Sequence, residues 1–290
     1  MLFFSTRAVV CVFLATVVLG GSIAGSSCRG AELQYPLSIA VASNGDLFLA
    51  DRNLPGVWKI GGGKLSVHFQ ASKKFRTPLN AVRCVRLDHE GKLLAGDSAT
   101  RNVYRFDDEG HPHPITKTTN GMGLIGIPMD IAVNSRGDVY VSDLEIQRVV
   151  KIPQGSDQPE EVAEISGCRG LFIDKDDYLW VVSTTTDQLH RITPDGEQTI
   201  VARGRPFQFP HTVVVGDDGT VFVCDGYAKT IWKIAADGKP VALAAGEPLV
   251  SPVGLAIKDD VLYVADPRAK SVFTIDSSGK ITRVGLQADE

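Results

Sequence analysis

The chain has 290 residues, of which 43% are hydrophobic and 22% charged, and its formal net charge is −4. A mildly acidic chain of this kind is a poor electrostatic match for nucleic acid, whose binding requires clustered basic charge. Apart from the first 30 residues, the length suits one large core, and all-β folds of this size often form a single domain. We expect one monomeric domain over residues 31–290.

Residues 1–30 have the layout of a secretory signal peptide: Arg7 precedes the apolar run Ala8–Leu19, and small residues follow. The apolar run is too short to span a bilayer comfortably. We therefore expect export to the exterior, the periplasm or the cell envelope, without an integral membrane span. A lipoprotein anchor on Cys28 is the alternative, although Gly25 stands where such signals usually carry leucine.

Six copies of one pattern fill the rest of the chain, at intervals of about 40 to 46 residues. Each copy predicts an inner strand, a tight turn, a second strand that ends on a polar residue, and a third strand. The inner strands open at Pro36, Val82, Pro128, Cys168, Pro210 and Pro252. The second strands end at Asp51, Asp97, Asp143, Ser183, Asp225 and Asp266.

These strands are rich in valine, isoleucine and aromatic residues and are separated by glycine-containing turns, which is typical of β-meanders. A fourth strand is visible in most copies, for example Gln198–Ala202. Repeated four-stranded sheets of this period are the blades of a β-propeller. We predict an all-β, six-bladed propeller of antiparallel blades. All four strands of the last blade come from the C-terminus, and a short strand at Glu32–Tyr35 that closes the ring is the alternative. The expected blades are 36–70, 82–117, 128–165, 168–202, 210–245 and 252–286.

The phrases PMDIAVNSRGDVYVSD, PLSIAVASNGDLFLAD and SPVGLAIKDDVLYVAD resemble NHL repeats. More distantly, the chain is similar to the six-bladed propellers of the gluconolactonase and regucalcin family and of the streptogramin lyases. The resemblance implies a six-bladed propeller over the whole mature chain. It leaves the activity open, because NHL relatives include ligand sensors, protein- and RNA-interaction domains and a few enzymes, and fold alone does not settle function.

Residues repeated in nearly every blade are expected to serve the blade. The aspartates that end the second strands should accept backbone hydrogen bonds in the following turn. Cys84, Cys168 and Cys224 lie in strand positions and should be buried thiols, with a Cys168–Cys224 disulfide as the alternative. His190 occupies a position that aromatic residues hold elsewhere and should pack in the core.

Residues that break the repeat point to a binding site. At the second position of the inner strands stand Leu37, Arg83, Met129, Arg169, His211 and Val253. Because inner strands begin around the channel mouth, Arg83, Arg169 and His211 should surround one entrance, with Asp130 between them and Arg86 deeper. Guanidinium groups suit carboxylate or phosphate. The alternative is that these charges pair with Asp130 and the strand-end aspartates.

Two glycine- or lysine-containing links, 71–81 and 118–127, are longer than the others and are candidates for a rim or lid over the mouth. Gly121, Gly123 and Gly126 satisfy GxGxxG literally, but a strand rather than a helix follows, so this is not a dinucleotide site.

The sequence therefore predicts an exported binding module whose basic mouth takes a small anionic ligand, a protein or a peptide, without a cofactor. The alternative is a metal-dependent hydrolase or lyase of the lactonase or streptogramin-lyase kind, for which calcium or zinc would be the metal. Neither GxSxG nor HExxH occurs, and no complete set of catalytic residues is recognisable, so a non-catalytic role is favoured.

Overall fold

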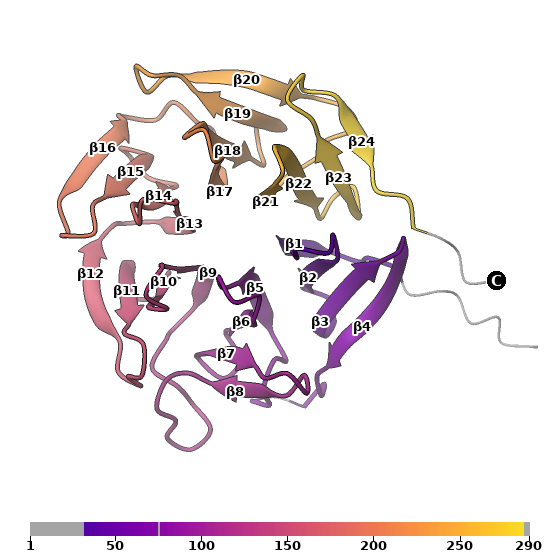
Figure 1. The fold of residues 1–290 in the computed structure, drawn as a ribbon, viewed down its shortest axis with the longest axis vertical. Coiled ribbons are helices and arrows are strands. Elements are labelled where there is room, and N and C mark those ends of the chain that lie inside the picture. The colour runs from indigo at the N-terminus through magenta and orange to yellow at the C-terminus, as the bar shows by residue number, and fades with distance from the viewer. Residues whose placement is uncertain (1–31, 75, 287–290) are drawn as a thin grey trace, which may run out of the picture.

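The computed structural model describes residues 32–74 and 76–286, which form six four-stranded antiparallel sheets around a central axis (Figure 1). Within each sheet the strands follow one another in sequence order, from the axis to the rim. The predicted six-bladed propeller is thus confirmed. The predicted signal peptide and Cys28 lie outside the described residues.

The innermost strands are β1 (Pro36–Val41), β5 (Val82–Leu87), β9 (Pro128–Val133), β13 (Cys168–Ile173), β17 (Pro210–Val215) and β21 (Gly254–Lys258). The second strands are β2 (Leu47–Asp51), β6 (Leu93–Asp97), β10 (Val139–Asp143), β14 (Leu179–Ser183), β18 (Val221–Asp225) and β22 (Val261–Asp266). The third strands are β3 (Leu54–Gly61), β7 (Asn102–Phe106), β11 (Arg148–Ile152), β15 (Leu189–Ile192), β19 (Thr230–Ile234) and β23 (Ser271–Ile275). The outermost strands are β4 (Lys64–Gln70), β8 (Pro112–Pro114), β12 (Glu160–Glu164), β16 (Gln198–Ala202), β20 (Pro240–Ala245) and β24 (Ile281–Arg283).

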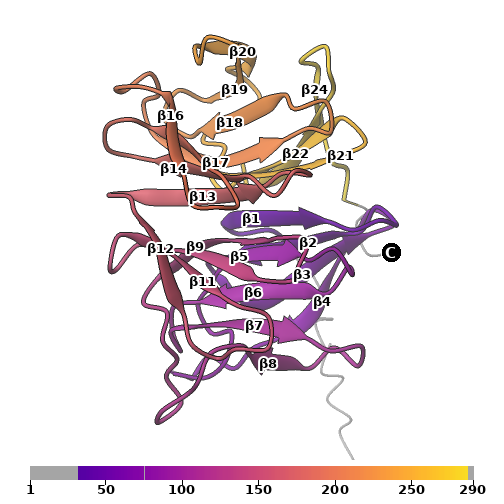
Figure 2. The same cartoon turned by 60° about the vertical axis from the view of Figure 1, so that its left-hand side comes forward.

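Inner strands begin at the predicted residues in five blades, and β21 begins two residues after Pro252. Among the described residues each blade takes its four strands from one continuous stretch of chain, so no strand exchange closes the ring. Blade 6 instead packs against blade 1 through side chains, including Leu33, Leu47 and Val272. Figure 2 shows β1 beside β21 and β22 at this seam. Lys258 Nζ adds a hydrogen bond to the Ser43 carbonyl oxygen at 2.8 Å.

The core lies between neighbouring blades, because apolar side chains leave both faces of each sheet. One cluster joins Ala50 and Val57 of blade 1 to Val85 and Ala95 of blade 2, and all four side chains are fully buried. A sheet that is apolar on both sides must be covered on both sides. Packing each blade between two neighbours satisfies that requirement around the whole ring.

The strand-end aspartates hold the blade together, as predicted. Asp97 is 0% exposed. Its carboxylate accepts hydrogen bonds from the backbone of Ala99 and Thr100 in the following turn and from the Thr100 hydroxyl. It also accepts from the backbone of Leu79 and Ala81, which precede the inner strand. The same two-sided pattern recurs at Asp51, Asp143, Asp225 and Asp266.

Blade 4 replaces this aspartate by Ser183, whose hydroxyl donates to the Ser166 carbonyl oxygen and accepts from the backbone of Thr185. Serine therefore keeps one hydrogen bond to the link before the inner strand and one to the turn after the second strand.

The thiols of Cys84, Cys168 and Cys224 are free and buried, so the disulfide alternative is wrong. Burial raises the pKa of Cys168 and of Cys224 to about 12, which leaves them as unreactive thiols. His190 is 6% exposed, and its Nδ1 lies 2.8 Å from Gln198 Nε2, so it is a packed core histidine as expected.

The glycine-rich link that precedes β9 serves packing. A Cβ on Gly123 would lie 2.4 Å from the Arg101 carbonyl oxygen, and the Gly126 amide donates to Asp143 Oδ2 at 2.7 Å. The link runs along the periphery in Figure 1. Within the described residues, no helix is both long enough and apolar enough to cross a bilayer.

Candidate functional site

In five of the six blades, a bulge at the start of the inner strand turns one side chain towards the mouth. In blade 1, Pro36 pairs with Asp51 and Ser38 with Ala50, so Leu37 is an extra residue in its strand. The same irregularity falls at Arg83, Met129, Arg169 and His211. Bulges re-aim side chains near functional sites. The second position is therefore released from the regular pleat in five blades, and in blade 6 the corresponding Val253 directly precedes β21.

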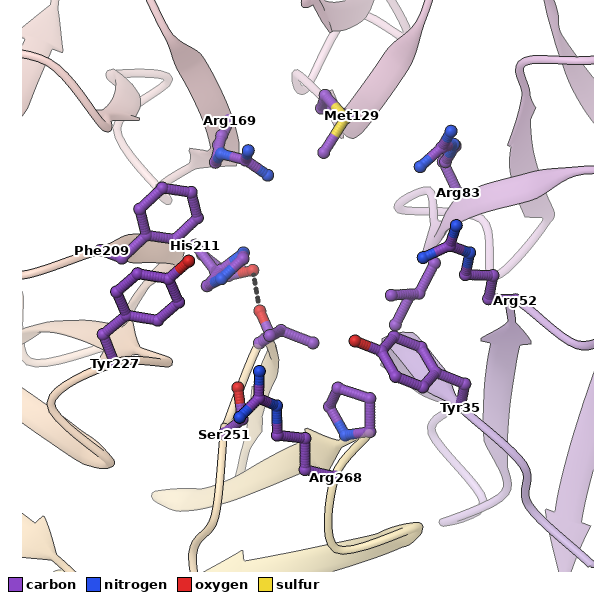
Figure 3. Close-up of a pocket in the computed structure, with 14 residues that line it drawn as sticks. Tyr35, Arg52, Arg83, Met129, Arg169, Phe209, His211, Tyr227, Ser251 and Arg268 are labelled. Atoms are coloured by element: carbon purple, nitrogen blue, oxygen red, sulfur yellow. Dashed lines mark hydrogen bonds between the residues drawn. The ribbon is translucent and has the colours of Figure 1, made fainter.

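A cavity of about 260 Å³ opens at this mouth (Figure 3). All six second-position residues line it, together with residues from the turns and links on the same face. The lining consists of Tyr35, Leu37, Arg52, Arg83, Met129, Arg169, Phe209, His211, Thr212, Tyr227, Ser251, Val253, Pro267 and Arg268. Arg83, Arg169 and His211 are thus brought together as the sequence suggests.

Aromatic rings build one wall of the cavity. The Arg169 guanidinium lies over the Phe209 ring at 4.8 Å, and Phe209 stacks on Tyr227 with ring centroids 4.7 Å apart and planes 18° apart. His211 meets Phe209 edge-on at 5.0 Å. A Cβ on Gly226 would lie 3.1 Å from His211 Nε2, so glycine gives this imidazole its room. Arg169 is therefore held in place by stacking.

The other arginines approach from different blades. Arg83 Nε donates to Ser98 Oγ at 3.2 Å, and the Arg52 guanidinium lies 5.9 Å from the centre of the Tyr35 ring. Arg268 is exposed and reaches the cavity from the turn after β22. Figure 3 shows Arg52 and Arg83 on the side of the cavity away from Phe209 and Tyr227.

Asp130 and Arg86 do not line the cavity; they form a buried pair with each other. Arg86 Nη2 lies 3.2 Å from both Asp130 carboxylate oxygens. Arg86 also donates to the carbonyl oxygens of Ile131 at 2.8 Å and Leu171 at 3.0 Å, which joins blades 2, 3 and 4. Burial raises the pKa of Asp130, and Arg86 opposes that shift. For these two residues the pairing alternative holds, and their role is to tie blades together.

The cavity is cationic and its lining contains no carboxylate. In the part of the chain that the structure describes, Arg52, Arg83, Arg169 and Arg268 form no ion pair. Burial lowers the pKa of Arg169, and the charge of Arg83 lowers it further. Burial and the Arg169 charge lower the pKa of His211 to about 3, so this imidazole is neutral at physiological pH.

The donors around the mouth do not fit a divalent metal. Calcium requires six to eight oxygen ligands and zinc three or four nitrogen, sulfur or carboxylate ligands. The lining offers one imidazole among four arginines, and the carboxylate of Asp130 is already bound to Arg86. No group of three or more histidine, cysteine or acidic side chains suited to a metal occurs in the described residues.

Sequence reasoning missed the outer half of the lining. Arg52 and Arg268 follow the strand-end aspartates by one and two residues, and Tyr35 and Phe209 directly precede inner-strand prolines. The strand-end aspartates accept hydrogen bonds from the backbone of the turn that follows them and of the link that precedes the inner strand. These bonds hold both segments at the mouth. These residues could have been found from the sequence, because each lies within two positions of an inner-strand opening residue or a strand-end aspartate. The described residues of links 71–81 and 118–127 do not line the cavity.

No curated protein sequence matched. A streptogramin B lyase structure aligns over 89% of this chain and 85% of its own, with 16% identity and a TM-score of 0.68. A gluconolactonase from Xanthomonas campestris aligns over 87% of both chains, with 14% identity and a TM-score of 0.70.

A structure of a nidogen/laminin complex aligns over 87% of this chain and 93% of the other, with 16% identity and a TM-score of 0.67. At these identities the likeness establishes the fold. The sequence model of the virginiamycin B lyase family matches residues 88–290, which is more than half of the chain. The chain therefore belongs to the virginiamycin B lyase family.

Proposed function

We propose that the mouth cavity binds a small anionic ligand and that the propeller acts as a binding module. The observation that carries the proposal is the group of four arginines, Arg52, Arg83, Arg169 and Arg268, that share one cavity without a carboxylate. Arg83 and Arg169 are half-buried, whereas Arg52 and Arg268 are exposed. Charges that are partly removed from water are usually paired, because desolvation is costly. A partner that brings negative charge would supply the missing counterion.

The chemistry of the lining narrows the ligand. Guanidinium groups form paired, charge-assisted hydrogen bonds with carboxylate and phosphate oxygens. Neutral His211, Thr212 and the tyrosine hydroxyls add uncharged hydrogen-bonding groups, while Leu37, Met129 and Val253 provide apolar surface. Ligand pockets commonly combine an apolar lining with a few convergent polar groups. A small carboxylate with a hydrocarbon part matches both properties.

Isothermal titration of the purified protein with benzoate, hexanoate and sulfate tests this function. We expect saturable binding that weakens at least tenfold in Arg169→Gln and by a smaller factor in Arg83→Gln. Arg205→Gln is the matched control, because Arg205 is exposed on the same face and does not line the cavity. Loss of binding in all three variants would contradict a site at the mouth, provided that their melting temperatures match the wild type.

A lyase or hydrolase acting at the same cavity is a second candidate, and family membership is the observation that favours it. Among the similar structures, a Staphylococcus aureus virginiamycin B lyase with a histidine-to-alanine change is described as catalytically inactive and holds quinupristin. In this chain His211 is the histidine of the cavity and stands beside Arg169. An anionic substrate would offset the Arg169 charge and raise the pKa of His211 towards the range useful for proton transfer.

Mass spectrometry of quinupristin and gluconolactone after incubation with the protein tests this candidate. A hydrolase adds one water to its product, whereas an elimination leaves the total mass unchanged and only alters retention. We expect turnover, if it occurs, to fall at least a hundredfold in His211→Ala. Equal turnover by His211→Ala and wild type would remove His211 from the chemistry.

A further inference from the structure

We infer that the mouth cavity is built for a ligand with two separated anionic groups joined by an apolar or aromatic spacer, as in a dicarboxylate. This inference rests on the proposed function and specifies its ligand class.

The arginines come from opposite sides of the ring. Arg169 lies in the inner strand of blade 4, and Arg52 follows β2 of blade 1. In a six-bladed ring two blades separate blade 1 from blade 4 in either direction. Figure 3 shows Arg169 facing across the cavity towards the side that carries Arg83 and Arg52. One small anion cannot bridge groups that start on opposite walls, whereas two linked anions can.

The first wall is rigid before any ligand arrives. Arg169 is fixed over Phe209, which is itself stacked on Tyr227. Arg169 Nε is buried without a hydrogen-bond partner among the described residues. Preorganised donors reduce the entropy cost of binding. This wall therefore presents a ready site for one carboxylate, beside a neutral imidazole that does not repel it.

The second wall supplies two more guanidinium groups. The bond from Arg83 Nε to Ser98 Oγ leaves the terminal nitrogens of Arg83 free of described partners, and Arg52 lies beside Tyr35. Together they can hold a second carboxylate. Arg268, from blade 6, completes the cationic rim between the two walls.

Apolar residues separate the two walls. In ring order the second positions read Leu37, Arg83, Met129, Arg169, His211 and Val253. Met129 stands between the two arginines on one side, and Val253 and Leu37 stand between His211 and Arg83 on the other. A hydrocarbon or aromatic spacer would contact these side chains, and removing such apolar surface from water favours binding.

Charge balance points to the same class. A monocarboxylate neutralises one of the four guanidinium groups and leaves the others to repel each other across a shielded cavity. Burial lowers the pKa of Arg169, and the Arg83 charge on the other wall acts in the same direction, as expected for repulsion between two cations. A dianion spread over both walls relieves this repulsion at each of them.

Paired probes separate this inference from the proposed function. Calorimetry would compare terephthalate and isophthalate with benzoate, and adipate with hexanoate, with sulfate as a dianion that has a single centre. We expect at least one dicarboxylate to bind tenfold or more tightly than its monocarboxylate partner, and more tightly than sulfate. Tighter binding of sulfate would mean that total charge, rather than separation, decides and would overturn the inference.

Variants locate the two walls. Arg52→Gln and Arg169→Gln should each reduce dicarboxylate affinity to about that of the monocarboxylate, and the double variant should abolish binding of both. Arg205→Gln should change every affinity by less than about twofold, because it removes one charge from the mouth face and no group from the cavity. If monocarboxylates and dicarboxylates bind equally in the wild type, the two-wall inference fails and the proposed function survives. If no anion binds at any concentration up to the solubility limit, the proposed function fails and the inference fails with it.

Discussion

His211 is the only histidine in the lining, and its environment sets its charge. Its pKa is about 3 because burial and the Arg169 charge both disfavour the imidazolium ion. In the unfolded chain the pKa returns to about 6.5. Between these two pKa values, His211 is protonated in the unfolded chain and neutral in the folded protein, so folding becomes less favourable as pH falls.

Replacing His211 by glutamine should therefore remove part of the acid sensitivity of the protein. The part of the free energy of unfolding that depends on neutral His211 is fully present above pH 6.5 and is lost as pH falls from 6.5 towards 3. Over the range from pH 6.5 to 4.5 the wild type should lose as much as about 2 kcal/mol more than His211→Gln. Urea denaturation at several pH values measures the difference. Parallel stability curves for the two proteins would contradict it.

The donor set of the mouth makes a prediction about metals. Because the cavity is lined by arginines and no carboxylate, dialysis against a chelator should leave the melting temperature and the dicarboxylate affinity unchanged. Thermal melting and titration before and after dialysis measure both quantities. A melting temperature that drops with chelator and recovers with calcium or zinc would show that other groups hold a metal.

At the level of single residues, the sequence predicted the half of the site that the repeat displays. Arg83, Arg169 and His211 stood out because they replace apolar residues in a repeated column. Asp130 and Arg86 stood out for the same reason, but the column cannot show which charges meet. Their pairing depends on how neighbouring blades approach, and Arg86 reaches the Leu171 carbonyl oxygen two blades away.

Each blade is an element with its own clamp. The Asp97 carboxylate joins the turn after β6 to the link before β5, so it holds the ends of two strands at once. A buried carboxylate bonded in this way leaves several backbone amides unsatisfied when it is removed, and each such loss is costly.

Asp97→Ala should accordingly destabilise the protein by about 3 kcal/mol or more. Asp195→Ala, in an exposed turn, is the matched control and should change stability by less than about 0.5 kcal/mol. Chemical denaturation measures both. Similar losses in the two variants would show that the strand-end aspartate is not the clamp.

Strands were more predictable than their irregularities. The periodic opening and closing residues predicted the blades closely, because a two-residue turn and an apolar strand leave little freedom of register. The bulge at the second position of five inner strands gives no such signal. In blade 1 it leaves Leu37 unpaired between Pro36, which pairs with Asp51, and Ser38, which pairs with Ala50. The three-residue β8 was not visible as a strand because Pro112 and Pro114 form two of its residues.

The whole molecule is electrically polar. The mouth face carries the turns after the second strands and the links between blades, and its basic residues include Lys73, Lys74, Arg101, Lys117, Arg203, Arg205 and Lys229. The turns on the opposite face are mostly acidic and include Asp108, Glu109, Asp176, Asp177, Asp195, Glu197, Asp217, Asp237, Asp259 and Asp260. A protein of net charge −4 thus presents a positive face to an approaching anion.

Such a field should steer anionic ligands to the mouth, and steering acts on the association rate. Lys73→Gln/Lys74→Gln should slow dicarboxylate association severalfold at low salt without changing dissociation. The difference should shrink near 0.15 M salt, where the screening length is about 8 Å. Stopped-flow tyrosine fluorescence measures both rates.

Lys64→Gln/Lys280→Gln, which removes the same charge from exposed turns on the opposite face, is the matched control. It should leave the association rate unchanged or slightly faster. Equal slowing by both pairs would mean that net charge, and not its distribution, controls association.

The seam between blade 1 and blade 6 rests on side-chain packing and lacks the backbone ladder that a shared strand would provide. Arg52 and Arg268 belong to these two blades, and both reach the mouth cavity. A dicarboxylate that contacts both arginines would link blade 1 to blade 6. Bound ligand would therefore slow local separation of these two blades. Amide exchange in β1 and β21 would then slow when the ligand is bound.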